Sequence, residues 1–429
     1  MTGGMNRRRF LEGSSAAVGA FAFTAATGWA SDDAPSNRVT VGVMGLSRGR
    51  ALAVGFAKQP GVTLKYCCDV DLDRAGAGAD AVRKSGTDQS PEAIQDFRRI
   101  LDDPEVDALV CAAPNHWHGP ATVLGCKAGK NVYVEKPACH NPHEGELMVE
   151  AARTYGKAVQ VGTQRRSSPQ LIEAVEAMRD GVIGRLYHAR SYYSNRRGTI
   201  GHADPSEPPA NLDYELWQGP APRQPFKSNV VHYNWHWFWH WGNGELGNNG
   251  VHALDLVRWG LGVDYPTHVV STGGRYVFDD DQQTPDTHTV SYEFPGRITA
   301  DWQGLSCNGN DPGPFVVFYG TEGALEMFGN GTYTIKDNAG KEVKSVEGVL
   351  GEPEHLANFL AAVRADAPLD LNAEVDAGVK STLLCHLGNI AQRTGRALTC
   401  DPDNGRIVGD EEAMSHWRRD YADGWAPTI

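Results

Sequence analysis

A chain of 429 residues with a formal charge of −13 is too acidic to present a binding surface for nucleic acid or for an anionic membrane. At about 150 residues per domain its length predicts two to three domains, and 41% hydrophobic residues suffice for their cores. Eight cysteines occur without a C-x-x-C pair, and several fall within apolar runs. We therefore expect buried thiols rather than disulfides or a metal site.

The N-terminus predicts a secretion signal. Arg7-Arg8-Arg9-Phe10-Leu11 precedes an apolar, small-residue run from Ala16 to Ala26, with a cleavage position after Ala30. The arginine pair resembles the twin-arginine export signal, although Asn6 stands where Ser or Thr is commoner. We expect residues 1–30 to be a signal peptide, residues 31–38 a linker, and the mature protein to be periplasmic, without a membrane span. The alternative is a basic tail with no sorting role.

Residues 39–162 predict a doubly wound Rossmann domain, because short apolar strands alternate with helices. The first strand begins at Val39 and stops at the turn Gly45-Leu46-Ser47-Arg48-Gly49, and a helix follows from Ala51 to Lys58. Strand, glycine turn and helix form the dinucleotide-binding arrangement, in which main-chain N–H groups face a pyrophosphate. The glycine pattern is imperfect, because Ser47 replaces its second glycine and the last glycine comes one position early.

The second strand supports a dinucleotide, because it ends at Asp69, about 20 residues after the glycines. A carboxylate there can accept the ribose hydroxyls of NAD and would repel the 2′-phosphate of NADP. The alternative for Asp69 is a helix cap.

Two later strands end in polar motifs. The strand from Val106 to Ala113 is closed by Pro114-Asn115-His116-Trp117-His118, and the strand of Val132 to Val134 by Glu135-Lys136-Pro137. Proline cannot continue a sheet ladder, so Lys136 is held at the carboxyl end of its strand, where parallel sheets bind ligands. A solvated lysine at a strand end is the alternative.

These motifs together resemble those of the Gfo/Idh/MocA oxidoreductases, the family of glucose–fructose oxidoreductase and inositol dehydrogenase, from about Val39 to the C-terminus. The resemblance implies NAD as the cofactor, and the fold class α/β plus α+β. That is a Rossmann domain followed by a domain with a large, mostly antiparallel open sheet. The predicted cofactor contacts are Gly45, Ser47, Arg48, Gly49, Asp69, Pro114, Asn115, His118, Glu135, Lys136 and Gln164.

Residues 163–429 predict this second domain. After a helix from Pro169 to Arg179, short strands alternate with turns; they include Leu186–Tyr193, Val269–Val270, Tyr276–Phe278, Thr287–Phe294, Ile298–Trp302 and Phe315–Tyr319. Residues 195–227, rich in Pro and Gly, predict an ordered arm. In the resembled family the open sheet face makes homodimers or homotetramers, and Trp417 and Trp425 are candidates for docking on a neighbouring subunit.

Four tryptophans recur at every second position from Trp235 to Trp241, so in a strand they would share one face. We predict a stacking wall for a sugar ring, with core packing as the alternative. His232, His236 and His240 recur every four residues, but no carboxylate or cysteine completes a ligand set, so we predict no metal site.

Asn248 and His252 are four residues apart and project from one face of the next helix. In the resembled family this helix faces the nicotinamide and carries an Asp and a His at this spacing. His252 matches that pattern, whereas Asn248 replaces the Asp. An amide can orient a hydroxyl but cannot take its proton. A histidine hydrogen-bonded at a helix start is the alternative for His252.

The predicted reaction is hydride transfer from a CH–OH carbon of a sugar to NAD, with a tightly retained cofactor. The predicted catalytic residues are Lys136, His252 and Asn248. The predicted substrate contacts are Arg165, Tyr193, Trp235, Trp237, Trp239, Asn248 and His252, with Arg166 as a further rim contact. His252 would act as general base with a near-neutral pKa. Two alternatives remain: a glycosidase that oxidises, eliminates and re-reduces, with His252, Tyr193 or Tyr233 as its second base, and a cofactor-binding protein without turnover.

Overall fold

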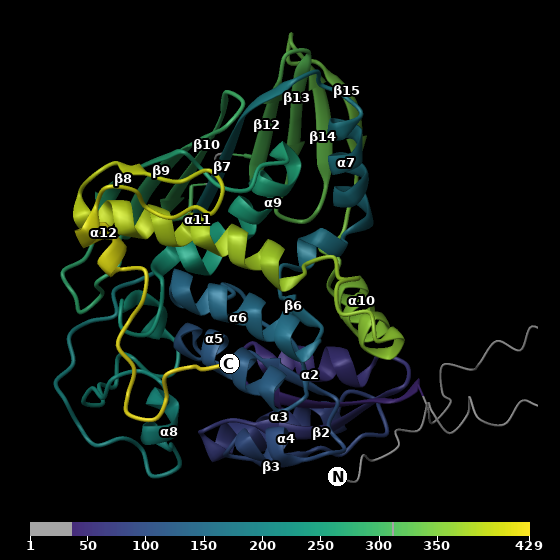
Figure 1. The fold of residues 1–429 in the computed structure, drawn as a ribbon, viewed down its shortest axis with the longest axis vertical. Helices are drawn as coiled ribbons and strands as arrows, with labels where there is room; N and C mark the ends of the chain where they lie inside the picture. Colours follow the sequence, from purple (N-terminus) through teal and green to yellow (C-terminus); the bar gives the residue numbers. More distant parts are fainter. Residues whose placement is uncertain (1–36, 311–312) are drawn as a thin grey trace, which may run out of the picture.

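Two β-sheets organise the chain, a parallel one in its first part and a mixed one in its second (Figure 1). The computed structural model describes residues 37–310 and 313–429. The predicted signal peptide and all but the last two residues of the predicted linker lie outside that range. Among the described helices, none combines the length and apolar character that a membrane span requires.

The first sheet has six parallel strands in the order β3-β2-β1-β4-β5-β6. Its strands are β1 Val39–Met44, β2 Val62–Cys68, β3 Glu92–Ile94, β4 Ala108–Cys111, β5 Asn131–Val134 and β6 Val159–Val161. Its helices are α2 Gly49–Ala57, α3 Leu72–Arg83, α4 Arg98–Asp102, α5 Asn115–Lys127 and α6 Pro142–Tyr155. Apolar clusters cover both faces, and most residues of the central strands β1 and β4 are apolar and buried. The chain reverses its strand order between β1 and β4, and ligands bind at such a switch point.

The second sheet follows the order β15-β14-β13-β12-β7-β10-β9-β8-β16. All neighbouring pairs are antiparallel except β7 and β10, which confirms the predicted mostly antiparallel sheet. Its strands are β7 Leu186–Arg196, β8 His268–Gly274, β9 Thr287–Phe294, β10 Ile298–Leu305, β11 Cys307–Asn308, β12 Val316–Gly320, β13 Gly323–Met327, β14 Tyr333–Asp337, β15 Glu342–Val346 and β16 Leu398–Thr399.

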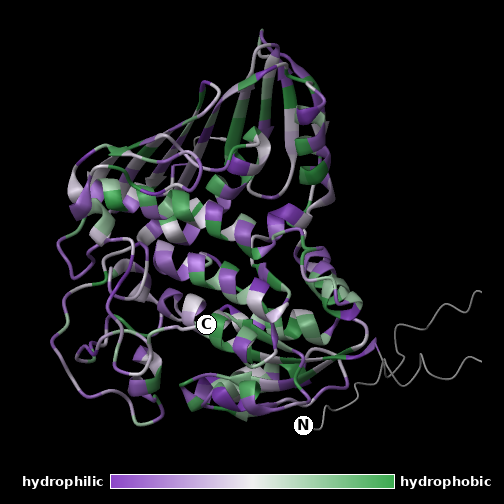
Figure 2. Ribbon diagram, viewed as in Figure 1, coloured by the Kyte–Doolittle hydropathy of each residue, from purple (hydrophilic) through white to green (hydrophobic). Residues whose placement is uncertain are grey.

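Helices cover one face of this second sheet. They are α7 Pro169–Arg179, α9 Val251–Leu261 and α11 Val375–Thr394, and the side chains of all three share one apolar cluster with the strands (Figure 1). Buried and more exposed residues alternate along β9, and Figure 2 shows the matching mixture of apolar and polar residues in this sheet. The short elements are η2 Gln164–Ser167, α8 Tyr214–Gln218, η3 Asn234–Trp237, η4 Leu246–Gly250 and α12 Glu411–Ser415.

Three segments of the second part return to the first sheet. Helix α10, Glu352–Ala365, packs Phe359 edge-on against Phe56 and Tyr133, with ring centroids 6.2 and 5.9 Å apart. The arm is longer than the predicted residues 195–227, and the name is used below for residues 197–241. It reaches the loop between β2 and α3, where the Asp213 amide donates to the Val70 carbonyl over 2.9 Å. The C-terminal tail, residues 416–429, lies along α5 and α6 (Figure 1).

Two local predictions were wrong. Tyr276–Phe278 forms no strand, because the Asp286 carboxylate accepts from the main-chain amides of Tyr276 and Val277 and holds a loop. Trp417 and Trp425 pack within their own chain: Trp417 is buried and donates to Glu146, and Trp425 lies edge-on against Trp117 at 5.2 Å.

Candidate active site

The glycine turn after β1 approaches the end of β4 more closely than any side chain would permit. Gly45 has φ of +84°, and a Cβ atom built on it would lie 2.6 Å from the Ala112 carbonyl oxygen. At Gly49 a Cβ atom would lie 3.1 to 3.2 Å from the side chains of Val43 and Ala112. The two glycines therefore let the turn and the start of α2 lie directly on the strand ends, which leaves the turn free to face a ligand.

Asp69 is locked to this turn. Its Oδ2 accepts from the Leu46 amide over 2.7 Å, its Oδ1 accepts from the Asp71 amide over 3.0 Å, and Arg74 Nε lies 3.6 Å from Oδ2. Burial raises the pKa of the carboxyl, while the two amides and Arg74 oppose that change. Asp69 is thus a fixed acceptor at the edge of the glycine turn.

The predicted cofactor pocket lies between this turn and the arm. Gly45, Ser47, Asp69 and Pro114 line one side of a cavity of about 60 Å³, and the arm contributes Trp217, His232 and Trp235 to its lining. The arm is fastened here, because His232 Nε2 lies 3.0 Å from an oxygen of Asp71 and the Asn211 amide donates to the same carboxylate over 3.0 Å.

The Glu-Lys-Pro motif is braced from two domains. Glu135 is buried and accepts from Arg48 Nε over 3.1 Å and from the Lys136 amide over 3.2 Å. Arg48 also pairs with Glu352 at the start of α10. The Glu135 side chain therefore positions the backbone of Lys136 rather than facing solvent.

Lys136 and Asn248 meet, as their predicted shared role requires. Lys136 Nζ donates to the Asn248 carbonyl over 2.8 Å and to Asn248 Oδ1 over 3.3 Å. Asn248 lies in η4, a π-helical turn that runs directly into α9, and such turns concentrate at functional sites. Burial lowers the pKa of the Lys136 ammonium, an effect that Glu135 and Glu245 oppose.

His252 lies one turn beyond Asn248 and presents a free nitrogen. Its Nδ1 is enclosed and has no hydrogen-bond partner among the described residues. Burial lowers the pKa of His252 well below its usual value, and the positive charges of Lys136, Arg165 and Arg48 lower it further. The predicted near-neutral pKa was therefore wrong, and the imidazole is held in its neutral form.

Among the predicted rim residues, Arg165 and Arg166 have different surroundings. The positive charge of Arg165 lowers the pKa of both His252 and Lys136. Its guanidinium group lies over the Phe315 ring at 4.9 Å, and burial lowers its own pKa to about 10. Arg166 instead forms a buried ion pair with Asp255 at 2.8 Å, so its assignment to the rim was wrong. Gln164, at the start of η2, remains a predicted cofactor contact.

Two further predicted contacts take structural positions. His118 is buried, and its ring nitrogens lie 2.6 and 2.8 Å from the carbonyl oxygens of Pro137 and Ala113. It positions the Glu-Lys-Pro turn, which corrects the predicted cofactor contact. Asn115 donates to Asn243 over 2.9 Å at the start of α5 and ties the two domains together.

The Tyr193 hydroxyl accepts from Asn195 over 2.8 Å, and burial raises its pKa.

The tryptophan segment is not a strand. Asn234–Trp237 is a 3₁₀ turn, so the rings diverge: Trp235 lines the cofactor pocket, Trp237 packs under Arg197 at 4.6 Å, and Trp239 lies under Arg393 at 5.0 Å. The predicted stacking wall for a sugar was therefore wrong as a single surface. The described residues contain no cluster of three or more metal-ligating side chains.

Glu245 and Arg197 escaped the sequence analysis. Glu245 is buried, binds Arg197 Nε over 2.6 Å and Ser306 Oγ over 3.2 Å, and supplies negative charge near Lys136. Its place three residues before Asn248 was an available signal. Arg197 lies 48 residues away in the sequence, and no spacing rule connects the two.

Comparisons with known proteins agree with the two-domain fold. Residues 37–163 match the oxidoreductase family's NAD-binding Rossmann fold, and residues 195–426 match its C-terminal alpha/beta domain. Levoglucosan dehydrogenase of Pseudarthrobacter phenanthrenivorans is 27% identical over 43% of this chain and 40% of its own length. Inositol 2-dehydrogenase of Rubrobacter xylanophilus is 32% identical over 37% and 45%, and a glycosyl hydrolase family 109 protein of Saccharopolyspora erythraea is 29% identical over 37% and 36%. The matches thus span less than half of each relative's length.

Solved structures share the fold over most of the chain. A levoglucosan dehydrogenase in complex with NADH and levoglucosan superposes with a TM-score of 0.65 at 18% identity, over 84% of this chain and 99% of that one. The WlbA dehydrogenase of Bordetella pertussis in complex with NADH and UDP-GlcNAcA gives 0.64 at 17% identity, over 85% and 99%. With its two family domains in this order, the chain belongs to the Gfo/Idh/MocA oxidoreductase family and has an NAD-binding Rossmann domain.

Proposed function

We propose that the protein is an NAD-dependent oxidoreductase that acts on a CH–OH carbon of a sugar or sugar derivative. The observation that carries the proposal is the meeting of the Lys136 ammonium with Asn248, one turn from the unbonded nitrogen of His252, at the carboxyl ends of the first sheet. Relatives named as dehydrogenases of levoglucosan and of inositol support a polyhydroxylated substrate.

The residues that line the cofactor pocket suit NAD. The Gly45 turn brings main-chain N–H groups and the start of α2 to one cavity, and Asp69 offers a fixed carboxylate for ribose hydroxyls. Bound there, NAD supplies the hydride acceptor.

The chain's own residues handle the proton. The Lys136 ammonium would donate to the substrate oxygen and favour its alkoxide form, and Asn248 holds that ammonium in place. Neutral His252 can accept the hydroxyl proton at Nδ1. Because its pKa is low, this transfer needs the substrate oxygen to be acidified by Lys136 at the same time.

The cofactor is retained, in this proposal, because the arm covers its pocket. A cavity of about 60 Å³ is far below the ~300–1,000 Å³ of small-molecule sites, so the arm must shift whenever a dinucleotide enters or leaves. Retention suits a protein exported to the periplasm, where no pool reoxidises free NADH. Export itself rests on residues 1–30 alone.

The second candidate is a redox-cycling glycosidase that oxidises, eliminates and re-reduces its substrate. Relatives named as glycosyl hydrolase family 109 proteins favour it. Both candidates require Lys136 and His252 in the roles given above.

One screen separates these functions. Purified protein is mixed with free sugars and with activated glycosides, while cofactor absorbance and released aglycone are followed together. Net NADH indicates the dehydrogenase, and aglycone release without net NADH indicates the glycosidase. Silence with every substrate would support a binding protein without turnover.

Lys136→Ala is expected to lower kcat by at least about a hundredfold while the cofactor stays bound, because one oriented donor to a developing alkoxide is worth that much. Lys127→Ala, an exposed lysine at the end of α5, is the control and should leave kcat unchanged. Full activity in Lys136→Ala would overturn the assignment.

A further inference from the structure

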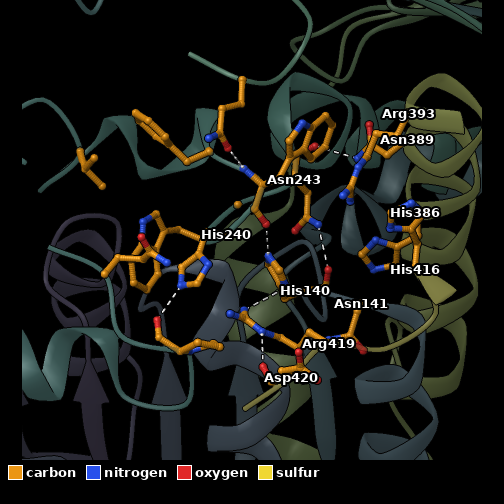
Figure 3. Close-up of a pocket in the computed structure, with 18 of the residues that line it drawn as sticks. His140, Asn141, His240, Asn243, His386, Asn389, Arg393, His416, Arg419 and Asp420 are labelled. Atoms are coloured by element: carbon orange, nitrogen blue, oxygen red, sulfur yellow. Dashed lines mark hydrogen bonds between the residues drawn. The ribbon is translucent and has the colours of Figure 1, made fainter. Parts of the chain in front are cut away.

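A large cavity lies outside the active site. This lateral cavity has a volume of about 770 Å³ and lies between the start of α6, the arm, the end of α11 and the C-terminal tail (Figure 3). Its size is that of a small-molecule site. Lys136, Asn248 and His252 are absent from its lining. Asn243 is a shared wall, because its Oδ1 accepts from Asn115 while its Nδ2 donates to the His140 carbonyl, each over 2.9 Å.

The charge of the lateral cavity is positive. Its lining contains Arg393, Arg418 and Arg419, and Asp420 is its one acidic residue. Figure 3 shows Arg393 on α11 and Arg419 on the tail, with His386, His416 and His140 drawn between them.

Within the described part of the chain, neither Arg393 nor Arg419 forms an ion pair with a carboxylate, although the charge of the buried Glu144 acts on Arg419. Arg393 only stacks over the Trp239 ring at 5.0 Å. Arg419 donates to His140 Nδ1 over 3.2 Å and to the Asp420 carbonyl over 3.3 Å. Burial lowers the pKa of both guanidinium groups, so each carries a desolvation cost that an anion would relieve. The lining's one lysine, Lys227, differs, because Asp281 neutralises it at 3.2 Å.

The histidines of the lateral cavity contribute hydrogen bonds rather than charge. His140 donates from Nε2 to the Trp239 carbonyl over 3.1 Å and accepts from Arg419 at Nδ1, which fixes its neutral tautomer. Burial lowers the pKa of His240 and of His386 to about 4. The arginines are therefore the groups that select an anion.

The remaining lining suits a sugar ring. Asn389 donates to the Asn243 carbonyl over 2.9 Å and keeps its amide oxygen for a hydroxyl. Asn141 is 5% exposed, and its side-chain amide lies against the Tyr421 hydroxyl and the Glu144 carboxylate at the wall of the cavity. Planar amides, arginines and rings such as Trp239 and Phe238 are the groups that bind hydroxylated rings with an acidic substituent.

We propose that the lateral cavity is a second binding site, separate from the active site, for a saccharide that carries carboxylates. Arg393 and Arg419 bind its carboxylates, and the amides bind its hydroxyls. The proposal goes beyond the redox function and does not depend on it.

Calorimetry on the full chain tests the proposal with three probes: a trigalacturonate, neutral maltotriose, and inorganic sulfate. Trigalacturonate is expected to bind, and Arg393→Gln should weaken it by about ten- to hundredfold, the usual value of a charge-assisted hydrogen bond. Arg419→Gln should act alike. If its contacts to the tail destabilise the fold, Trp239→Ala, which removes the ring under Arg393, is the second variant. The matched control is Arg396→Gln, because Arg396 lies three residues beyond Arg393 and pairs with Asp410 outside the cavity.

Each outcome decides. Lys136→Ala should leave trigalacturonate binding unchanged even if it abolishes turnover. The second-site proposal and the redox proposal can therefore be refuted independently of each other. Loss of binding in Lys136→Ala, with Arg393→Gln unaffected, would place the acidic sugar in the active site and overturn the proposal. Equal binding of sulfate and trigalacturonate would show a site for anions in general and would overturn the proposal of a saccharide site. Equal binding of maltotriose, or no binding by any probe, would also overturn it.

Discussion

Asp69 combines two tasks that are usually described separately. It holds the glycine turn through the Leu46 amide, and it faces the pocket where a ribose would lie, with Arg74 beside it at 3.6 Å. We predict that this carboxylate both favours NAD and keeps Arg74 from meeting a 2′-phosphate.

Asp69→Ser should therefore shift cofactor preference. We expect the ratio of kcat/KM with NADP to that with NAD to rise about tenfold or more, because relief of ~1.4 kcal/mol of like-charge repulsion already gives that factor. Steady-state kinetics with both cofactors measure it. Asp80→Ser, on the same helix as Arg74 but paired with Arg83, is the control, and an unchanged ratio in Asp69→Ser would refute the role.

After burial and the adjacent Glu135, Glu245 is the next influence on the pKa of Lys136, and it acts from the second domain. Its negative charge raises the pKa of Lys136 against the effect of burial. In Glu245→Gln the ammonium loses its proton at lower pH, so the alkaline limb of the kcat/KM profile should move to lower pH. Glu326→Gln, which touches only the Lys336 pair, should leave the profile in place. A profile that stays fixed in Glu245→Gln would show that Lys136 is not the titrating group.

At the scale of elements, the arm is the least expected part. Asn211 and His232 fasten it to Asp71, next to the cofactor pocket. The double variant Asn211→Ala/His232→Ala should speed release of bound reduced cofactor about ten- to hundredfold, since hydrogen bonds to a carboxylate are broken. A fluorescence chase with excess cofactor measures the rate. His202→Ala, on the same arm but facing Asp281, is the control, and equal release rates in all three proteins would contradict retention by the arm.

The motifs at the carboxyl ends of the first sheet's strands were predictable, because each is marked by residues close together in the sequence. The glycine turn, Asp69 and the Glu-Lys-Pro motif each follow a buried apolar strand, and the parallel order brings them to one edge. Asn248 and His252 were predictable from helical spacing alone. The geometry confirms that these residues gather, while their chemical roles stay predictions.

What could not be predicted depends on contacts between distant segments. The period-two tryptophans indicate a strand only if the chain is extended, but here they pack into an apolar cluster made almost entirely of the arm's own side chains, in which Asn234–Trp237 forms a 3₁₀ turn. The Glu245–Arg197 pair and the low pKa of His252 likewise arise from tertiary burial, which no local pattern encodes.

At the scale of the molecule, buried neutral histidines make the fold sensitive to acid. Burial lowers the pKa of His240, His288, His355 and His386 to about 4. The unfolded chain protonates these groups near their usual value of 6.5, so stability is complete above it and falls as pH drops toward 4. Glu144, whose pKa burial raises to about 7, contributes in the opposite direction, as one group against four.

We expect the free energy of unfolding to fall by up to about 1.4 kcal/mol per pH unit for each such histidine between pH 6.5 and 4. Urea titrations across this range measure the slope. His386→Gln should reduce it, whereas His268→Gln, at an exposed position on β8, should not. A flat profile would contradict the burial of these groups.

Assembly into dimers or tetramers through the open sheet stays a prediction, which sedimentation can address.

The tail also determines when the first domain can complete its folding during synthesis. Tyr421 donates to the buried Glu144 over 2.9 Å, and the Trp425 ring lies edge-on against Trp117, so residues 416–429 complete the packing of a domain that begins almost 400 residues earlier in the sequence. A nascent chain folds from its N-terminus onward, but here the first domain cannot complete its packing until residues 416–429 have been synthesised. Stalled or truncated products should consequently be marked by an unfinished first domain, and a quality-control protease could recognise them by it.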